Sequence, residues 1–201
     1  MPLDQSGGGT SLPAIALPRG GVLTLDLASV VGWAYAPVTY LVPWFGRWFL
    51  VPSADSGLPP VNFEGLRYAA FENALIPFLE RTRPSALILE SALPIQAMAE
   101  HSSQGIANQQ LGLRAIALKE AYRYACPVSS IDTRTVRREV LGQAFFPPKQ
   151  VKKIIVSACY RRGWRVPDHN AGDACMVWEW HRMRMMGIPP LAGPLWREAV
   201  A

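Results

Sequence analysis

The chain has few cysteines, and their spacing matches no common site. It carries only three in 201 residues, and no two of them form a Cys-x-x-Cys pair. The odd number and the wide spacing exclude the disulfide framework of a small secreted domain and the ligand spacing of a zinc knuckle. This cysteine usage favours a reducing cytoplasm. The three residues are Cys126, Cys159 and Cys175.

Long apolar runs are also missing. The most apolar stretch, residues 22–51, is broken by two charged residues and two prolines, so it is too short to span a bilayer as a helix. These interruptions are Asp26, Pro37, Pro43 and Arg47. Residues 1–20 are rich in Gly, Ser and Pro and place Asp4 before any Lys or Arg, which is unlike a secretory signal. We expect a soluble cytoplasmic protein with a flexible tail over residues 1–20, one domain over 21–186 and an extension over 187–201.

Two common catalytic motifs are absent as well. No serine lies in a Gly-x-Ser-x-Gly setting, which excludes the nucleophile elbow of serine hydrolases. No Gly-x-x-x-x-Gly-Lys-Ser/Thr sequence is present, which excludes a P-loop nucleotide site. His101 and His181 show no metal-ligand spacing and are interpreted as structural. The chemistry of this chain therefore has to come from other residue types.

What the chain does contain is a pair of apolar strands, each with one acid. The first is VLTLDLASVVGWAY, residues 22–35, in which Asp26 is the only charged residue. The second is ALILES, residues 86–91, which ends with Glu90 and a serine. A carboxylate that is buried without a partner costs several kcal/mol, so each acid needs a cation, a donor or a metal ion beside it.

The order of the expected elements predicts an α/β fold. Strands over residues 22–27, 33–36 and 44–51 follow one another closely, which is typical of an antiparallel meander. The later strands alternate with helices, which implies parallel pairing through helical crossovers. The later segments are a helix from residue 63 to about 84, a strand at 86–91, a helix at 111–125, a strand at 127–131, and helices at 133–141, 149–162 and from 168 onward. We expect a mixed five-stranded sheet flanked by helices.

A third acid lies on an apolar helix face. Asp173 shares this face with Met176, Val177 and Trp180, at the spacing of successive helical turns. Each acid also has a structural alternative, since Asp26 could bond backbone amides, Glu90 could pair with an arginine and Asp173 could be a satisfied core acid.

If the fold brings the three acids together, their mutual repulsion calls for divalent cations. All-oxygen sites suit Mg²⁺ or Mn²⁺. Two such ions about 3.5 to 4 Å apart stabilise the attacking and leaving oxygens of phosphodiester hydrolysis.

Residues 134–165 carry a strong positive charge. They hold nine Lys or Arg against one acid, Glu139, so the local net charge of +8 exceeds the +5 of the whole chain. A basic stretch beside an acidic site suits the phosphate backbone of a nucleic acid, and a solvated helix face is the alternative. The nine residues are Arg134, Arg137, Arg138, Lys149, Lys152, Lys153, Arg161, Arg162 and Arg165.

These segments resemble the RuvC-type Holliday junction resolvases. VLTLDLASVVGWAY is similar to their first strand, with its Asp and its turn to a Gly-Trp-like second strand, and ALILES is similar to their Glu-bearing strand. TVRREVLGQAFFPPKQVKKIIV resembles their basic helix, glycine and lysine segment, and HNAGDACMVWEW resembles their last Asp-Ala helix. The resemblance runs from about Val22 to His181 and is strongest to the short, divergent resolvases of bacteriophages.

The resemblance implies an RNase H-like fold and an endodeoxyribonuclease that resolves four-way and other branched DNA junctions as a homodimer. It identifies Asp26, Glu90 and Asp173 as catalytic, metal-binding acids that hold two Mg²⁺ ions, with Mn²⁺ able to substitute. It also places Arg137 and Lys149 at phosphate-contacting positions. We assign the neighbouring Arg138, Lys152 and Lys153 to DNA binding too.

The chain departs from the family pattern at two places. Asn170 stands at the position of the family's fourth acid. We retain Asn170 as a metal ligand, and His169 or Asp168 is able to compensate for the missing carboxylate. The Pro-Gly after the first Asp is Leu27 and Ala28. Two other functions stay open on the sequence: another RNase H-like nuclease that acts on hybrids or flaps, and a module that binds branched DNA without cleaving it.

Overall fold

The computed structural model describes residues 16–50, 63–91 and 104–190. Most of the predicted N-terminal tail and C-terminal extension lies outside these ranges. The described part nevertheless reaches back before residue 21, because Leu17 is buried in the core and the Gly20 amide donates to the Thr82 carbonyl at 3.0 Å. Packing against the core therefore extends to Leu17 within the described residues.

The centre of the fold is a mixed five-stranded sheet with the strand order β3-β2-β1-β4-β5. β1 pairs antiparallel with β2, and β2 pairs antiparallel with β3. β1 also pairs parallel with β4, and β4 pairs parallel with β5. The predicted meander and the parallel half are both confirmed. The strands are β1 (Val22–Asp26), β2 (Val30–Ala36), β3 (Trp44–Phe49), β4 (Ala86–Glu90) and β5 (Val128–Ile131).

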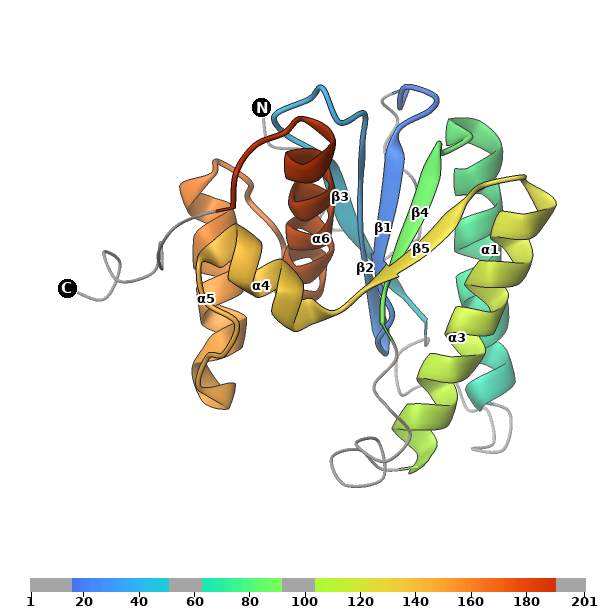
Figure 1. Ribbon diagram of the computed structural model, residues 1–201. Coiled ribbons are helices and arrows are strands. Elements are labelled where there is room, and N and C mark those ends of the chain that lie inside the picture. The colour runs from blue at the N-terminus through green and yellow to red at the C-terminus, as the bar shows by residue number, and fades with distance from the viewer. Residues whose placement is uncertain (1–15, 51–62, 92–103, 191–201) are drawn as a thin grey trace.

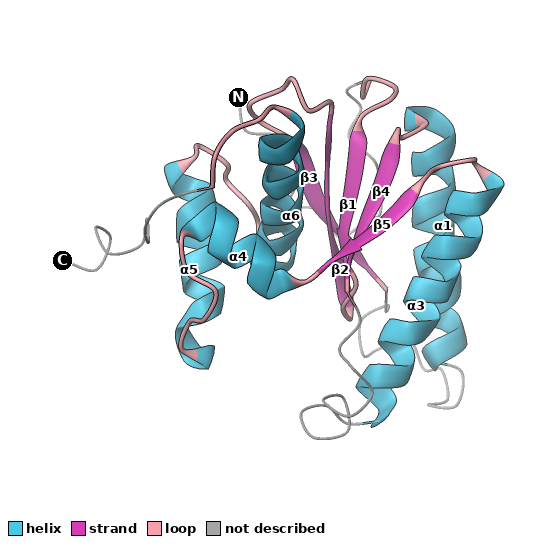
Figure 2. Ribbon diagram, in the orientation of Figure 1, coloured by secondary structure: helices cyan, strands magenta, loops and turns pink. Residues whose placement is uncertain are grey.

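Helices cover both faces of this sheet (Figure 1). α1 and α3 lie on one side, and α4, α5 and α6 lie on the other (Figure 2). Each layer has its own apolar cluster, because alternate strand residues point to opposite faces. Leu23 and Leu25 of β1 belong to the cluster under α1 and α3, whereas Val22 belongs to the other. The helices are α1 (Phe63–Thr82), α3 (Gln104–Arg123), α4 (Thr133–Leu141), α5 (Pro148–Arg161) and α6 (His169–Met185).

The predicted elements agree with the observed ones in number and order, but two of them begin earlier than predicted. β2 begins at Val30, which pairs with Phe49 of β3, instead of at residue 33, and α3 also starts early. This helix begins at Gln104, whereas apolar periodicity predicted its start at residue 111. Its first turns are polar because they bond to α1 instead of entering the core. Arg67 donates to the Gln109 side chain at 2.8 Å, and the Tyr68 hydroxyl donates to the Asn108 carbonyl at 3.3 Å. None of the helices in the described ranges is long and apolar enough to cross a membrane.

α6 lies unusually close to the sheet. The buried Thr24 hydroxyl of β1 donates to the Ala174 carbonyl of α6 at 2.8 Å, and the Trp178 indole donates to the Ala36 carbonyl of β2 at 3.0 Å. At the start of the helix, a Cβ on Gly32 would lie 2.0 Å from the Asn170 carbonyl oxygen. Only glycine at this position lets the first turn of α6 rest on β2.

We therefore predict that Gly32→Ala destabilises the protein, on the order of 1–3 kcal/mol, because α6 has to move away from β2. The measurement is the free energy of unfolding by denaturant. Gly65→Ala on α1 is the matched control, since a Cβ there meets nothing within 4 Å. In a helix this control should be neutral or stabilising. Equal stability of Gly32→Ala and the unchanged protein would contradict the close approach.

Candidate active site

Asp26 and Glu90 lie at the same edge of the sheet. Both end their strands, and the parallel register that pairs Leu25 with Leu89 puts the two acids beside each other. Neighbouring strands are about 4.8 Å apart. By alternation, Asp26 points to the same face as Thr24, which is the face that α6 covers.

Asp173 reaches this edge from α6. It precedes Ala174, whose carbonyl accepts the Thr24 hydroxyl two residues before Asp26. The side chain of Asp173 is 17% exposed, and the Arg137 guanidinium of α4 lies 3.7 Å from its Oδ1. The structure thus brings together the three acids that the sequence singled out.

Burial and the neighbouring charges shift the pKa values of two of these carboxyls. Burial raises the pKa of Asp26 well above its ordinary value, and repulsion from Asp173, Glu90 and Asp168 raises it further. Burial is also the main cause that raises the pKa of Asp173 to about 7, where repulsion from Glu90 adds to it and Arg137 and Lys152 oppose it. Without a cation between them, the carboxylates are held together against their mutual repulsion.

Glu90 is held by residues that follow β5 and lie on α3. The Thr133 hydroxyl, at the start of α4, donates to the Glu90 carboxylate. Arg114 of α3 donates to the Glu90 main-chain carbonyl at 2.9 Å and also bonds the Ser130 hydroxyl of β5. No local sequence pattern predicts Arg114 at this site. Thr133 was detectable in principle, because it lies close after a strand that ends at this same edge.

Asp168 is the N-cap of α6 and has partners on both carboxylate oxygens. Its Oδ1 accepts the Ala171 amide at 3.0 Å, and its Oδ2 accepts Arg47 of β3 at 3.1 Å. These bonds fix the start of the helix that carries Asp173, which gives Asp168 a structural role. Arg47 was missed by the sequence analysis, because it lies 121 positions away from its partner and no local pattern links the two.

His169 and Asn170 form the first turn of α6. Burial lowers the pKa of His169, and the Lys152 charge lowers it further, so its imidazole is neutral over a wider pH range than usual. The Asn170 main chain is the group that rests on Gly32. Both residues lie on the turn before Asp173, and their service as metal ligands stays a prediction.

The three carboxylates fit a divalent cation by donor type and by charge. They are hard oxygen donors, and the repulsion between them is what Mg²⁺ or Mn²⁺ would neutralise. Over residues 16–50, 63–91 and 104–190, however, no three His, Cys, Asp or Glu side chains already converge to hold one ion. The Arg137 guanidinium, 3.7 Å from the Asp173 carboxylate, is the positive charge that lies beside this acid instead. Metal binding at this edge therefore requires side-chain rearrangement.

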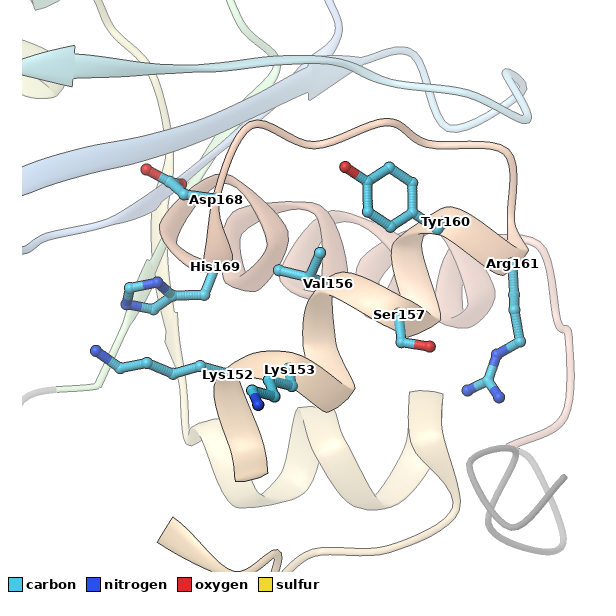
Figure 3. A pocket seen from close by; sticks show the side chains of 8 residues that line it. All are labelled: Lys152, Lys153, Val156, Ser157, Tyr160, Arg161, Asp168 and His169. Carbon is cyan, nitrogen blue, oxygen red and sulfur yellow. The ribbon is translucent and has the colours of Figure 1, made fainter. Parts of the chain in front are cut away.

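A basic cleft opens beside the acids. It has a volume of about 670 Å³ and lies between α5 and the start of α6. Figure 3 shows the His169 ring and the Lys152 side chain at one end of the cleft and Arg161 at the other. Val156 also lines the cleft, and cations predominate among its charged residues. The lining residues are Lys152, Lys153, Val156, Ser157, Tyr160, Arg161, Asp168 and His169.

The remaining predicted DNA-binding residues lie on α4 and α5. Lys149 is exposed in the first turn of α5, one helical turn before Lys152 and Lys153. Arg138 of α4 has a side chain that is 63% exposed, and its guanidinium lies 4.0 Å from the Glu139 carboxylate. Arg137 differs from them, since it faces Asp173 instead of solvent.

We predict that the metal-free protein loses stability as the pH rises from about 4 to about 7. The Asp173 carboxyl has its pKa raised from 3.8 to about 7 by folding, so the folded state binds more protons than the unfolded state within this window. Asp173→Asn should therefore be more stable than the unchanged protein at pH 8 in EDTA, by more than about 1 kcal/mol, and close to it at pH 4. Unfolding by denaturant at both pH values measures this.

Glu64→Gln is the control for this prediction, because Glu64 is exposed on α1 on the other side of the sheet. It should leave the pH dependence unchanged. If Asp173→Asn were less stable than the unchanged protein at pH 8, the pair with Arg137 would outweigh the burial and the repulsion.

Comparisons with known proteins agree on the fold. No family model and no curated protein sequence matches the chain. Among solved structures, RuvC of Thermus thermophilus in complex with a Holliday junction substrate has a TM-score of 0.59 at 16% identity, over 86% of this chain and 100% of that one. A second structure of RuvC from the same organism has a TM-score of 0.55 at 15% identity, over 85% of this chain and 99% of that one.

A third structure extends the likeness to a eukaryote. The yeast mitochondrial Holliday junction resolvase Ydc2 has a TM-score of 0.52 at 12% identity, over 86% of this chain and 82% of that one. At these identities the likeness establishes the architecture, a mixed sheet with helices on both faces. The chain has the RNase H-like fold that RuvC has, as its sequence predicted.

Proposed function

We propose that the protein is a metal-dependent endodeoxyribonuclease that nicks four-way or other branched DNA junctions in the cytoplasm. The observation that carries this proposal is the meeting of Asp26, Glu90 and Asp173 at one edge of the sheet, beside a cleft lined with Lys and Arg. The fold is that of RuvC, which has been solved with a Holliday junction. The three cysteines are free and buried, which suits a reducing compartment.

The three acids are the proposed ligands of Mg²⁺. When bound, such ions activate water and stabilise the charge that develops on the phosphate during hydrolysis. The chain's own residues prepare the site for this. Thr133 orients Glu90 by its hydroxyl, and the N-cap bond of Asp168 and its pair with Arg47 set the position of α6.

Arg137 has two partners in this proposal. In the structure its guanidinium lies 3.7 Å from Asp173, and its Nε is buried without a hydrogen-bond partner among the described residues. An arginine in this position can exchange the carboxylate for a phosphate oxygen, for which its planar fork is well suited. The exchange would also free Asp173 for a cation.

The basic cleft is the proposed track of the DNA backbone. Lys152 lies close enough to lower the pKa of both Asp173 and His169, so the cleft begins at the acidic edge. Lys149 and Lys153 continue the positive charge along α5. A phosphate held here would place the neighbouring phosphodiester next to the carboxylates.

We predict that the protein nicks a synthetic four-way junction in Mg²⁺ or Mn²⁺, and that Asp26→Asn abolishes this nicking. Asp173→Asn should also abolish cleavage while leaving junction binding largely intact, because the phosphate contacts come from α4 and α5. The measurement is the release of labelled strands on denaturing gels. A flap and an RNA/DNA hybrid are run beside the junction.

The outcomes separate the alternatives. A junction that is bound but survives both metals would leave a binding module, and faster cleavage of the flap or the hybrid would reassign the substrate.

We also propose a homodimer, which would nick two opposed strands. It should sediment at twice the 22.1 kDa of the chain in the same preparation, and a single-chain mass would remove the dimer.

We predict further that Lys149→Ala and Lys152→Ala weaken junction binding and each lower its salt slope by about one unit, since each would remove one phosphate contact. The slope comes from dissociation constants at several salt concentrations. Arg19→Ala is the control of equal charge, because Arg19 is exposed before β1, at the opposite end of that strand from Asp26. An unchanged slope in a lysine variant would put that lysine outside the DNA path.

A further inference from the structure

A row of paired residues crosses the sheet at the acidic edge and contains an arginine. Asp26 of β1 pairs with Gly32 of β2, and Gly32 pairs with Arg47 of β3. Residues that lie directly opposite each other on paired strands point to the same face, so Arg47 and Asp26 are both on the face that α6 covers. The first turn of α6 rests on the glycine between them. A positive charge of the protein is therefore fixed in the same row as Asp26.

Two of the four carboxylates at this edge have an arginine as partner. Arg47 donates to Asp168 at 3.1 Å. The Arg137 guanidinium lies 3.7 Å from Asp173. The side chains of these two acids are only 20% and 17% exposed, and arginine keeps its proton in proteins, so both pairs are lasting ones. The four carboxylates, the last three of which repel the first, are Asp26, Glu90, Asp168 and Asp173.

The two acids on the strands have no such partner. Over residues 16–50, 63–91 and 104–190, neither Asp26 nor Glu90 takes part in an ion pair. The Thr133 hydroxyl that donates to Glu90 carries no charge. Two unpaired carboxylates are neutralised by one divalent cation. A second cation of this charge would leave the site with an excess of positive charge in the absence of DNA.

The position that could supply a further carboxylate holds an amide. Asn170 lies three residues before Asp173 on α6, and side chains at this spacing share one face of a helix. The main chain of Asn170 is in contact with Gly32, which fixes this turn on the sheet. An amide oxygen can bind a hard cation, but it brings no negative charge. Asn170 therefore does nothing to balance the charge of a second ion.

We propose that the site binds a single divalent cation, and that Arg47 and Arg137 supply the positive charge that a second ion would bring. This inference rests on the proposed function and departs from the two ions that the family resemblance implies. The two arginines have different roles. Arg137 stabilises the charge on the phosphate, since its planar fork can bind two phosphate oxygens at once. Arg47 is a positioning residue, which neutralises Asp168 and keeps it out of the set of cation ligands.

The test counts the Mn²⁺ ions that each chain binds in the absence of DNA, from the EPR signal of the ions that stay free. The unchanged protein should bind one ion. Asn170→Asp should bind two, because the added carboxylate supplies the charge that a second ion needs. Arg47→Gln should also gain an ion, since it leaves Asp168 without its cation. The rate of junction nicking by the unchanged protein should rise with the first power of the Mg²⁺ concentration before it saturates.

Asn73→Asp is the matched control, because Asn73 is exposed on α1, on the other side of the sheet. It should bind one ion, and unfolding temperatures establish that all variants are folded. Two ions per chain in the unchanged protein would overturn the single-ion site and leave the proposed function standing. One ion in both the unchanged protein and Asn170→Asp would show that charge does not set the number of ions, which also overturns the inference. If no ion binds and no junction is nicked, the proposed function and the inference fail together.

Discussion

The contact between the first turn of α6 and β2 is the constraint on which the rest of the site depends. It exists because Gly32 has no side chain at the point where the Asn170 carbonyl arrives. The Thr24 hydroxyl then fixes the height of the helix along β1 through the Ala174 carbonyl. With both contacts in place, the Asp173 carboxylate lies close enough to Asp26 to raise its pKa. Packing contacts outside the site therefore hold these acids close together in spite of their mutual repulsion.

The other face of the sheet supplies the rigidity that this arrangement needs. Trp33, Trp48 and Phe78 pack against one another there, with ring centroids between 5.3 and 6.1 Å apart. Edge-to-face and stacked aromatic pairs of this kind add stabilisation beyond the area they bury. The aromatic cluster under α1 and α3 therefore stiffens the sheet, while the acids lie at its edge on the side of α4 and α6. A rigid sheet keeps the strand ends that carry these like charges from moving apart.

Local pattern was sufficient to predict the elements and the acids, and insufficient to predict what holds the acids. Asp26 and Glu90 were detectable because each is an acid within an apolar strand, and Asp173 because it lies on an apolar helix face. Two strand ends in a parallel pair necessarily share an edge, so even their meeting followed from the chain order. Arg47 and Arg114 could not be found in this way. Each is an ordinary arginine in its own segment, and its partner is decided only when distant elements pack.

The chain order of the site also has a consequence for synthesis. The Thr24 and Ala174 contact joins positions 150 residues apart, and α6 is the last helix that the structure describes. A chain still emerging from the ribosome can pair β1 with β4 and bring two carboxylates to the edge, but the third arrives only when α6 docks. Closing such a long loop is slow compared with forming the local hairpin of β1 and β2. The proposed site therefore acquires its complete set of three acids only when α6 docks, late in folding.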